Sequence, residues 1–294
     1  MPLAITTPTG HIGSRLTRRL FDAGEDLTLL VRNPEKLPAD IRAKARVETG
    51  DLTDAAFVAR ATAGADALFW LTFVPFNSPD PREAARHQAS VAAGAVRANR
   101  IPHVVNLSSF GAHHASGYGP VSNVQMVENA LNDAGENVLH LRPGSFMENY
   151  LNYVPTLRSA GSIFAPFPGD VALPTIATRD IGDAAAEGLL DRSWTGKRYR
   201  GLHGPADLTG GEAAAILTDV LGRPVRHVQV SPEQGREALI GMGASPAFAD
   251  AYVEMYQGFA HDPAPAEPRS PETTTPTTLA AWAGEVLKPL VSAS

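Results

Sequence analysis

A short turn with two glycines follows the first apolar run of the chain, Leu3 to Thr6. A buried strand, a tight turn and a helix start direct backbone N–H groups and the positive end of the helix dipole at an anion. Gly10 lets the backbone approach a pyrophosphate, and Gly13 lets the helix pack closely on the strand. The spacing favours a dinucleotide-binding turn over a purely structural one. The turn consists of Thr7, Pro8, Thr9, Gly10, His11, Ile12 and Gly13.

Two basic residues follow the second apolar run, Leu27 to Val31. In an NAD-specific fold, an acidic side chain near this point binds the 2′-hydroxyl of the ribose. Here Arg32 takes that place, and Lys36 adds a second positive charge. A guanidinium binds phosphate through two parallel hydrogen bonds, so the sequence favours NADP(H) over NAD(H). A solvated arginine at a strand end is the alternative interpretation.

Short apolar runs alternate with amphipathic segments through the first 150 residues. A helix is predicted from Pro81 to about Asn99, because Asp80 can cap it and Glu83 completes a capping box. Continuous apolar strands separated by helices are typical of a parallel sheet that is covered on both faces. We therefore predict an α/β fold, with a Rossmann-type doubly wound sheet that binds NAD(P) in residues 1–150.

The alternation weakens after residue 150. Residues 151–294 are predicted to form a small α+β substrate lobe, with some segments returning to the sheet. Strands are expected at 163–168, 171–176 and 225–230, and helices at 181–190, 211–221 and 279–287. The proline- and threonine-rich stretch 261–278 is predicted to be an extended connection.

The composition excludes several kinds of site. The chain has 294 residues, no cysteine and a formal net charge of −6. Without cysteine there is no disulfide, thiolate nucleophile or cysteine-ligated metal, and the histidines lack metal-site spacing. The acidic balance disfavours a nucleic-acid partner. No apolar run approaches the ~20 residues that cross a bilayer, and no signal-peptide pattern is present, so we expect no membrane partner and a cytoplasmic location.

Several segments resemble the NmrA-like family of atypical short-chain dehydrogenases. Besides the glycine turn, they are Val31 to Lys36, Gly50 to Asp54 and Leu141 to Asn149. The resemblance continues through 178–181 and 221–225. The family includes NADPH-type quinone oxidoreductases, NADPH azoreductases and redox sensors of nitrogen regulation. It therefore implies a Rossmann fold and NADP(H), without selecting one activity.

The resemblance also implies roles for residues that contact the cofactor. The glycine turn would hold the pyrophosphate, and Arg32 with Lys36 would hold the 2′-phosphate. The remaining contacts would come from Asp51 and Leu52 at the adenine, from Thr72 and Phe73 under the ribose and nicotinamide, and from Asn106 and Ser108 facing the nicotinamide. Thr7 replaces the first glycine of the family pattern, so we expect a looser turn and weaker cofactor binding.

A wall between cofactor and substrate is implied by the same resemblance. Phe146, Met147 and Asn149 would form it, although the spacing of Phe146 and Met147 alone is more typical of core residues. Further aromatic residues, Phe73, Phe76, Tyr150 and Tyr153, would line the crevice. This lining predicts a hydrophobic small-molecule substrate.

The usual proton donor of short-chain reductases is missing. In that class a tyrosine, whose pKa is lowered by a lysine four residues later, protonates the product oxygen. Related enzymes carry a glutamate four residues after the lysine, and Glu128 matches it. Pro120 and Val124 then occupy the tyrosine and lysine positions. Hydride transfer is still possible, because the cofactor supplies the hydride.

Substitute acids are predicted on the loop after the fifth strand. Ser109 lies nearest in sequence to the serine of the usual triad, and Tyr118 carries a hydroxyl. His113 and His114 could donate a proton near neutral pH, although adjacent histidines in such a loop are more often solvated.

Two functional hypotheses follow from these observations. The preferred one is an NADPH-dependent oxidoreductase that reduces a hydrophobic quinone, enone or carbonyl. The rival is a non-catalytic NADP(H)-binding redox sensor that acts through a protein partner, and the missing tyrosine and lysine favour it. A homodimer is left open.

Overall fold

Seven parallel strands form the central sheet, in the order β10-β6-β5-β4-β1-β2-β3. The computed structural model describes residues 2–292 of the chain. The strands are β1 (Leu3–Thr6), β2 (Leu27–Val31), β3 (Arg46–Thr49), β4 (Ala67–Leu71), β5 (His103–Leu107), β6 (Asn137–Pro143) and β10 (Lys197–Leu202). This arrangement confirms the predicted α/β fold class.

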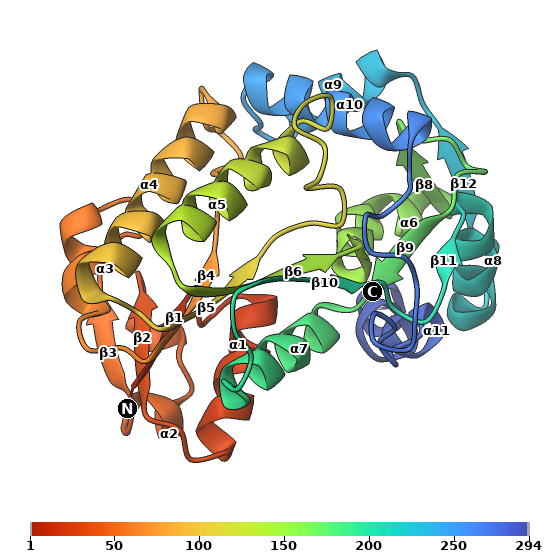
Figure 1. The fold of residues 1–294 in the computed structure, drawn as a ribbon. Coiled ribbons are helices and arrows are strands. Elements are labelled where there is room, and N and C mark those ends of the chain that lie inside the picture. The colour runs from red at the N-terminus through yellow and green to blue at the C-terminus, as the bar shows by residue number, and fades with distance from the viewer. Residues whose placement is uncertain (1, 293–294) are drawn as a thin grey trace.

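Helices cover both faces of this sheet (Figure 1). Helices α3 (Ala55–Ala61), α4 (Pro81–Asn99) and α5 (Pro120–Ala134) cover one face, and α1 (His11–Asp22) and α7 (Thr178–Leu190) cover the other. Side chains alternate along a strand, so Leu3 and Ile5 enter the core beneath α1 while Ala4 enters the core beneath α4. A 3₁₀ turn (Pro34–Lys36) and α2 (Ala39–Arg42) follow β2.

The cap at the start of α4 forms as its sequence predicts, whereas the predicted capping box does not, because the Glu83 carboxylate pairs with Arg86. The carboxylate of Asp80 accepts a hydrogen bond of 2.8 Å from the backbone N–H of Glu83, and Pro81 occupies the first turn. Since proline lacks an N–H that the first turn would leave unpaired, it fits there without loss.

The strand order reverses between β1 and β4. Their neighbours β2 and β5 lie on opposite sides, so the loops that follow β1 and β4 diverge and leave a crevice at the carboxyl ends of the strands. The buried hydroxyl of Thr6 joins the two strands at this point. It donates to the carbonyl of Phe69 at 3.0 Å and accepts from the N–H of Leu71 at 3.1 Å.

The C-terminal half builds a second layer beside the sheet (Figure 1). Its elements are β7 (Ser145–Phe146), a 3₁₀ helix (Met147–Tyr153), α6 (Val154–Ala160), β8 (Ser162–Ala165), β9 (Leu173–Ile176), β11 (Asp207–Leu208), α8 (Gly210–Leu221), β12 (Arg226–Gln229), α9 (Pro232–Gly241), α10 (Pro246–His261), α11 (Leu279–Trp282), a π turn (Ala283–Leu287) and α12 (Lys288–Ser292). Helices α9 and α10 lie outside the sequence predictions. Of the helices within residues 2–292, none has both the length and the apolar character to span a membrane.

Segments of the C-terminal half also join the first layer. Strand β10 pairs with β6 at the sheet edge, and α7 packs against α1. The division at residue 150 stays a prediction.

The extended segment 262–278 fastens the two halves together. Buried Asp180 at the start of α7 accepts hydrogen bonds from the N–H of Thr277 at 2.9 Å and from its hydroxyl at 2.6 Å. Farther back in the segment, Glu267 pairs with Arg142 of β6 at 2.8 Å. The segment therefore supplies the hydrogen-bond donors of buried Asp180 and a second carboxylate to Arg142, which also pairs with Glu128.

We expect Asp180→Ala to lower the free energy of unfolding by about 2–3 kcal/mol, because hydrogen bonds to a charged group contribute about 1.5–3 kcal/mol and their loss leaves the N–H and O–H donors of Thr277 without their acceptor. Urea denaturation followed by circular dichroism measures the change. Asp219→Ala, at an exposed position of α8, is the control and should change stability by less than about 0.5 kcal/mol. Equal effects in both variants would contradict the fastening role.

Candidate active site

The glycine turn closes tightly over the start of α1. Thr7 adopts a left-handed backbone conformation with a φ of 51°, and its carbonyl accepts the N–H of Gly10 at 3.2 Å. Gly13 lies directly beneath, where an added Cβ would overlap the carbonyl oxygen of Thr7. The expectation of a looser turn at Thr7 is therefore wrong, because threonine adopts the backbone conformation that suits glycine.

This turn has the features of an anion site. The first turn of α1 contains no acidic residue, and no side chain caps its N-terminal N–H groups. Thr9, Gly10 and His11 are exposed there. The hydroxyl of Thr7 is buried and has no hydrogen-bond partner within residues 2–292. A pyrophosphate would supply acceptors for these groups, so the residues present fit a dinucleotide.

The end of β2 has the positive charge that a 2′-phosphate requires. Arg32 and Lys36 are both exposed, and the Arg32 guanidinium lies 5.9 Å from the ring centre of Phe73, which follows β4. Asp51 accepts the N–H and the hydroxyl of Thr53, both at 2.8 Å, and its predicted contact with the adenine stays a prediction. These bonds, aided by the charge of Arg32, lower the pKa of Asp51. Leu52 packs on the core beneath α3 and α4.

A cavity of about 180 Å³ lies beyond the turn, between the loop after β4, the first turns of α5, and α10. Its lining is mostly apolar. The residues are Thr72, Val74, Pro81, Ala85, Pro120, Asn123, Val124, Phe248 and Tyr252. Pro120 and Val124, which take the places of the usual tyrosine and lysine, thus face the same space as Thr72.

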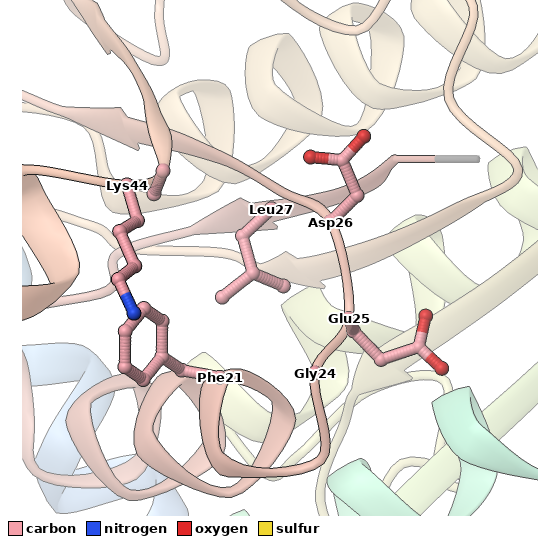
Figure 2. A pocket seen from close by; sticks show the side chains of 7 residues that line it. Phe21, Gly24, Glu25, Asp26, Leu27 and Lys44 are labelled. Atoms are coloured by element: carbon pink, nitrogen blue, oxygen red, sulfur yellow. The ribbon is translucent and has the colours of Figure 1, made fainter.

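A second hollow, of about 200 Å³, lies at the opposite end of the sheet (Figure 2). It borders the start of β2 at Leu27, and the Lys44 ammonium lies 5.5 Å from the ring centre of Phe21. Ligands of open α/β sheets bind at the carboxyl ends of the strands. The cavity beside Thr72 is therefore the candidate active site.

The loop after β4 is fixed from both sides. The backbone of Phe73 is held by the buried side chain of Gln88, which accepts its N–H at 3.0 Å and donates to its carbonyl. Phe76 packs on Phe248 of α10 at 4.8 Å between ring centres. Ser245, which caps α10, donates its N–H to the carbonyl of Phe76 at 3.2 Å. The half-exposed rings of Phe73 and Phe76 therefore have defined positions near the cavity.

A buried polar network lies beneath α5. The hydroxyl of Ser108 donates to Glu128 at 2.5 Å, and Glu128 forms a two-point ion pair with Arg142 at 2.9 and 2.7 Å. Burial opposes the charge of Arg142, yet hydrogen bonds and the charges of Glu128 and Glu267 raise its pKa. The network joins the end of β5 to α5 and β6, so it fixes the floor on which a nicotinamide would rest.

Asn106 belongs to a neighbouring buried chain of polar groups. Its amide contacts His140 at 3.0 Å, and the other ring nitrogen of His140 contacts Asn132 of α5 at 3.0 Å. Burial lowers the pKa of His140 to about 4, so the imidazole is neutral at neutral pH. The Asn106 side chain is 0% exposed. It therefore supports α5 from below and does not reach the cavity surface.

The predicted substitute acids lie around the loop that precedes α5. The Tyr118 hydroxyl donates to the carbonyl of Asp262 at 3.0 Å, and its ring stacks on His114 at 3.9 Å. Burial, with the charge of Asp262, raises the pKa of Tyr118. Desolvation and the neighbouring His113 lower the pKa of His114. Ser109 is half-buried in this loop.

The residues predicted to form the wall between cofactor and substrate differ in how exposed they are. Met147 is 0% exposed within the C-terminal core, and Phe146 packs against the main core. Asn149 is exposed. Tyr150 and Tyr153 are half-buried beside the C-terminal core, where burial raises the pKa of Tyr150 to about 12. None of these five borders the 180 Å³ cavity.

The cavity residues that the sequence analysis did not predict as site residues include Asn123, Phe248 and Tyr252. The signal for the last two is present in the sequence. Ser245 and Pro246 form a helix start, and aromatic residues at 248, 252, 256 and 259 follow at helical spacing.

Comparison with known proteins agrees with this geometry. The model of the NmrA-like family matches residues 2–271. The chain belongs to the NmrA-like family. This confirms the resemblance that the motifs indicated.

Relatives of this NmrA-like protein include named reductases. (4-Alkanoyl-5-oxo-2,5-dihydrofuran-3-yl)methyl phosphate reductase from Streptomyces griseus is 32% identical, over 86% of this chain and 85% of that protein. NAD(P)H azoreductase from Xenophilus azovorans is 31% identical, over 84% of each. The NADPH-dependent quinone oxidoreductase of Escherichia coli, solved in complex with NADPH, has a TM-score of 0.78 at 24% identity, over 97% of this chain and 99% of that one. This last likeness shows the shared fold.

Thr7→Gly is expected to stabilise this NmrA-like protein by about 1 kcal/mol. A left-handed conformation costs a residue with a side chain about 1–2 kcal/mol, and glycine removes this cost. The greater conformational freedom of glycine in the unfolded state offsets about 0.5–1 kcal/mol of that gain. Urea denaturation measures the change. Thr9→Gly, in the same turn without a positive φ, is the matched control and should destabilise. A loss of stability in both variants would show that Thr7 is not strained.

Proposed function

We propose that this protein is an NADPH-dependent reductase of a small hydrophobic quinone, enone or carbonyl compound. One observation carries the proposal: the crevice at the reversal of strand order joins an anion-ready glycine turn to an apolar cavity. The loop that begins at Thr72 belongs to both, since Phe73 lies by Arg32 while Thr72 and Val74 line the cavity. A cofactor and a small substrate would meet there.

In this proposal, each part of the cofactor contacts a different set of residues. The glycine turn from Thr7 to Gly13 holds the pyrophosphate, Arg32 and Lys36 hold the 2′-phosphate, and the strand ends at Thr72 and Ser108 support the nicotinamide. Bound NADPH supplies a hydride. The chain orients the reactants and excludes water from an apolar cavity.

The choice of substrate class follows from the missing general acid. Pro120 and Val124 carry no proton that could be transferred. A quinone or an activated enone gives a stabilised anion when reduced, whereas a simple ketone gives a strongly basic alkoxide. The name of the Streptomyces griseus relative describes an alkene conjugated to two carbonyls, which supports the same class.

The rival proposal is a silent NADP(H) sensor. The same apolar pair at 120 and 124 favours it, because a sensor needs the cofactor site without a proton donor. The cavity favours the enzyme, since a sensor that reads only the cofactor has no use for a second, substrate-sized space beside it.

Stopped-flow oxidation of NADPH, followed at its absorbance band with a panel of quinones, enones and ketones, decides between the two. The reductase predicts saturable oxidation that is faster with quinones than with simple ketones. NADPH binding without turnover on any member of the panel would favour the sensor.

Arg32→Ala should weaken NADPH binding by about 1–3 kcal/mol, the range of a hydrogen bond between charged groups, and should leave NADH binding nearly unchanged. Fluorescence titration with both cofactors measures this. Arg97→Ala, exposed at the far end of α4, is the matched control for the loss of one positive charge. Equal losses for NADPH and NADH would show that Arg32 is structural.

Tyr118→Phe and Ser109→Ala should each lower turnover by less than the ~100-fold that marks the loss of a dedicated general acid. The reason for Tyr118 is that its hydroxyl is already bonded to the carbonyl of Asp262. Steady-state rates on one quinone and one ketone provide the measurement, with NADPH affinity as the control. A collapse of turnover with intact cofactor binding would identify a general acid on this loop.

A further inference from the structure

One wall of the cavity comes from the C-terminal half of the chain. Helix α10 packs against α5 (Figure 1) and contributes Phe248 and Tyr252 to the cavity that Pro120 and Val124 also line. Pro120, at the tyrosine position on α5, carries no group that could donate a proton. A different tyrosine, Tyr252 of α10, lines the same cavity.

Two glycines set the position of this wall. Gly119, with a φ of 48°, lies so close to α10 that an added Cβ would overlap the carbonyl oxygen of Ala251. About two turns after Ala251 on α10, Gly258 lies against the carbonyl of Gly117 in the same way. Backbone therefore meets backbone at both points, and the helix is held directly against the start of α5. Tyr252 follows immediately after Ala251, the residue at the first contact.

The ring of Tyr252 is fixed by aromatic neighbours. It stacks on Phe248 at 4.7 Å between ring centres, with 22° between the planes, and meets Tyr256 edge-on at 6.4 Å. Phe248 in turn packs on Phe76. An aromatic stack of this kind orients a side chain without any hydrogen bond. The hydroxyl is thus available for a ligand.

Three polar side chains line the cavity. The Thr72 hydroxyl accepts the indole N–H of Trp70 at 3.0 Å. The Asn123 amide and the Tyr252 hydroxyl form no hydrogen bond with any group in the described part of the chain. Burial raises the pKa of Tyr252, so the hydroxyl keeps its proton and can donate it in a hydrogen bond.

The size of the cavity limits what can react there. An apolar cavity of about 150 Å³ holds one benzene molecule, and this one measures about 180 Å³. It accommodates one ring. The exposed rings of Phe73 and Phe76 extend the apolar surface toward solvent, where the remainder of a larger substrate would lie.

We infer that Tyr252 donates a hydrogen bond to the reacting oxygen of the substrate, and that the reacting part of the substrate is a single planar ring such as a benzoquinone or a cyclic enone. The inference rests on the proposed reductase function for the identity of the reaction. It assigns to α10 the contact that α5 supplies in the usual short-chain site.

The balance of the reaction defines what Tyr252 does. Transfer of a hydride from NADPH brings two electrons and a hydrogen nucleus to the substrate and leaves NADP⁺. The electron pair displaced from the C=O bond, or from the conjugated C=C–C=O system, collects on the substrate oxygen. The Tyr252 O–H stabilises this oxygen anion by a hydrogen bond, and water protonates the product when it leaves the cavity. The tyrosine itself ends the cycle unchanged.

The first test measures binding apart from turnover. The probe is 4-nitrophenolate at pH 8, a single ring with an anionic oxygen, titrated into the protein saturated with NADP⁺. Its visible absorbance shifts when the oxygen accepts a hydrogen bond. We expect Tyr252→Phe to weaken probe binding about 10-fold and to abolish the shift, with NADP⁺ affinity unchanged. Failure of the wild-type protein to bind the probe would overturn the inference.

Tyr256→Phe is the matched control. Tyr256 lies one turn later on α10, is also half-buried and does not line the cavity. We expect less than a two-fold change in probe binding. Equal losses in both variants would show a general effect on α10. A larger loss in Asn123→Ala than in Tyr252→Phe would assign the donor to α5. Either result overturns the inference.

The second test separates this inference from the proposed function. On one quinone and one cyclic ketone, Tyr252→Phe should lower kcat/KM about 10- to 100-fold, with the greater loss on the ketone, whose anion needs more stabilisation. Full activity of Tyr252→Phe would leave the reductase proposal standing and overturn the role of Tyr252. The opposite result is also possible: probe binding depends on Tyr252, but none of the tested compounds supports NADPH oxidation by the wild-type protein. That result would leave the Tyr252 contact standing and overturn the reductase proposal.

Discussion

The close approach of α1 to the turn after β1 is the constraint on which the rest of the site depends. Because Gly13 lies beneath the carbonyl of Thr7, the helix begins directly at the strand end and its N–H groups face the crevice. The hydroxyl of Thr6 ties the same strand end to β4, so the turn and the loop at Thr72 keep a fixed separation. Backbone contacts and the Thr6 hydroxyl therefore set the spacing of the strand ends that border the crevice.

The two helices that border the cavity, α5 and α10, are held in place by different kinds of contact. Beneath α5 lies a polar layer, in which Ser108, Glu128 and Arg142 are fully paired. A buried ion pair adds little net stability but favours one arrangement over its alternatives. Across the cavity, α10 is held by stacked aromatic rings and by backbone contacts at Gly119 and Gly258. One side therefore depends on buried charge pairs and the other on close packing.

Local patterns explain which parts of the fold were predictable from the sequence. Each strand and helix of the sheet layer has its own hydrophobic pattern in the sequence. The glycine turn, Arg32 and the Asp80 cap are also local signals, since each involves only a few consecutive residues. The cavity wall is different, since Tyr252 meets Pro120 across more than a hundred residues. The spacing of aromatic residues along α10 predicts a helix with one apolar face. It does not predict which other element that face packs against. The contact of Asn106 with His140 on β6 is likewise invisible in the local sequence. Met147 lies in the C-terminal core, as its spacing alone indicated, and the site roles of both residues stay predictions.

The extended segment 262–278 has a consequence for how the chain matures during synthesis. Arg142 and Asp180 come early in the order of translation, whereas Glu267 and Thr277 are synthesised only after α8, α9 and α10. Until then, Arg142 can pair with Glu128 alone, and Asp180 lacks the hydrogen bonds that it accepts from Thr277. The contacts that this segment makes with both layers can therefore form only after the helices of the second layer have been made.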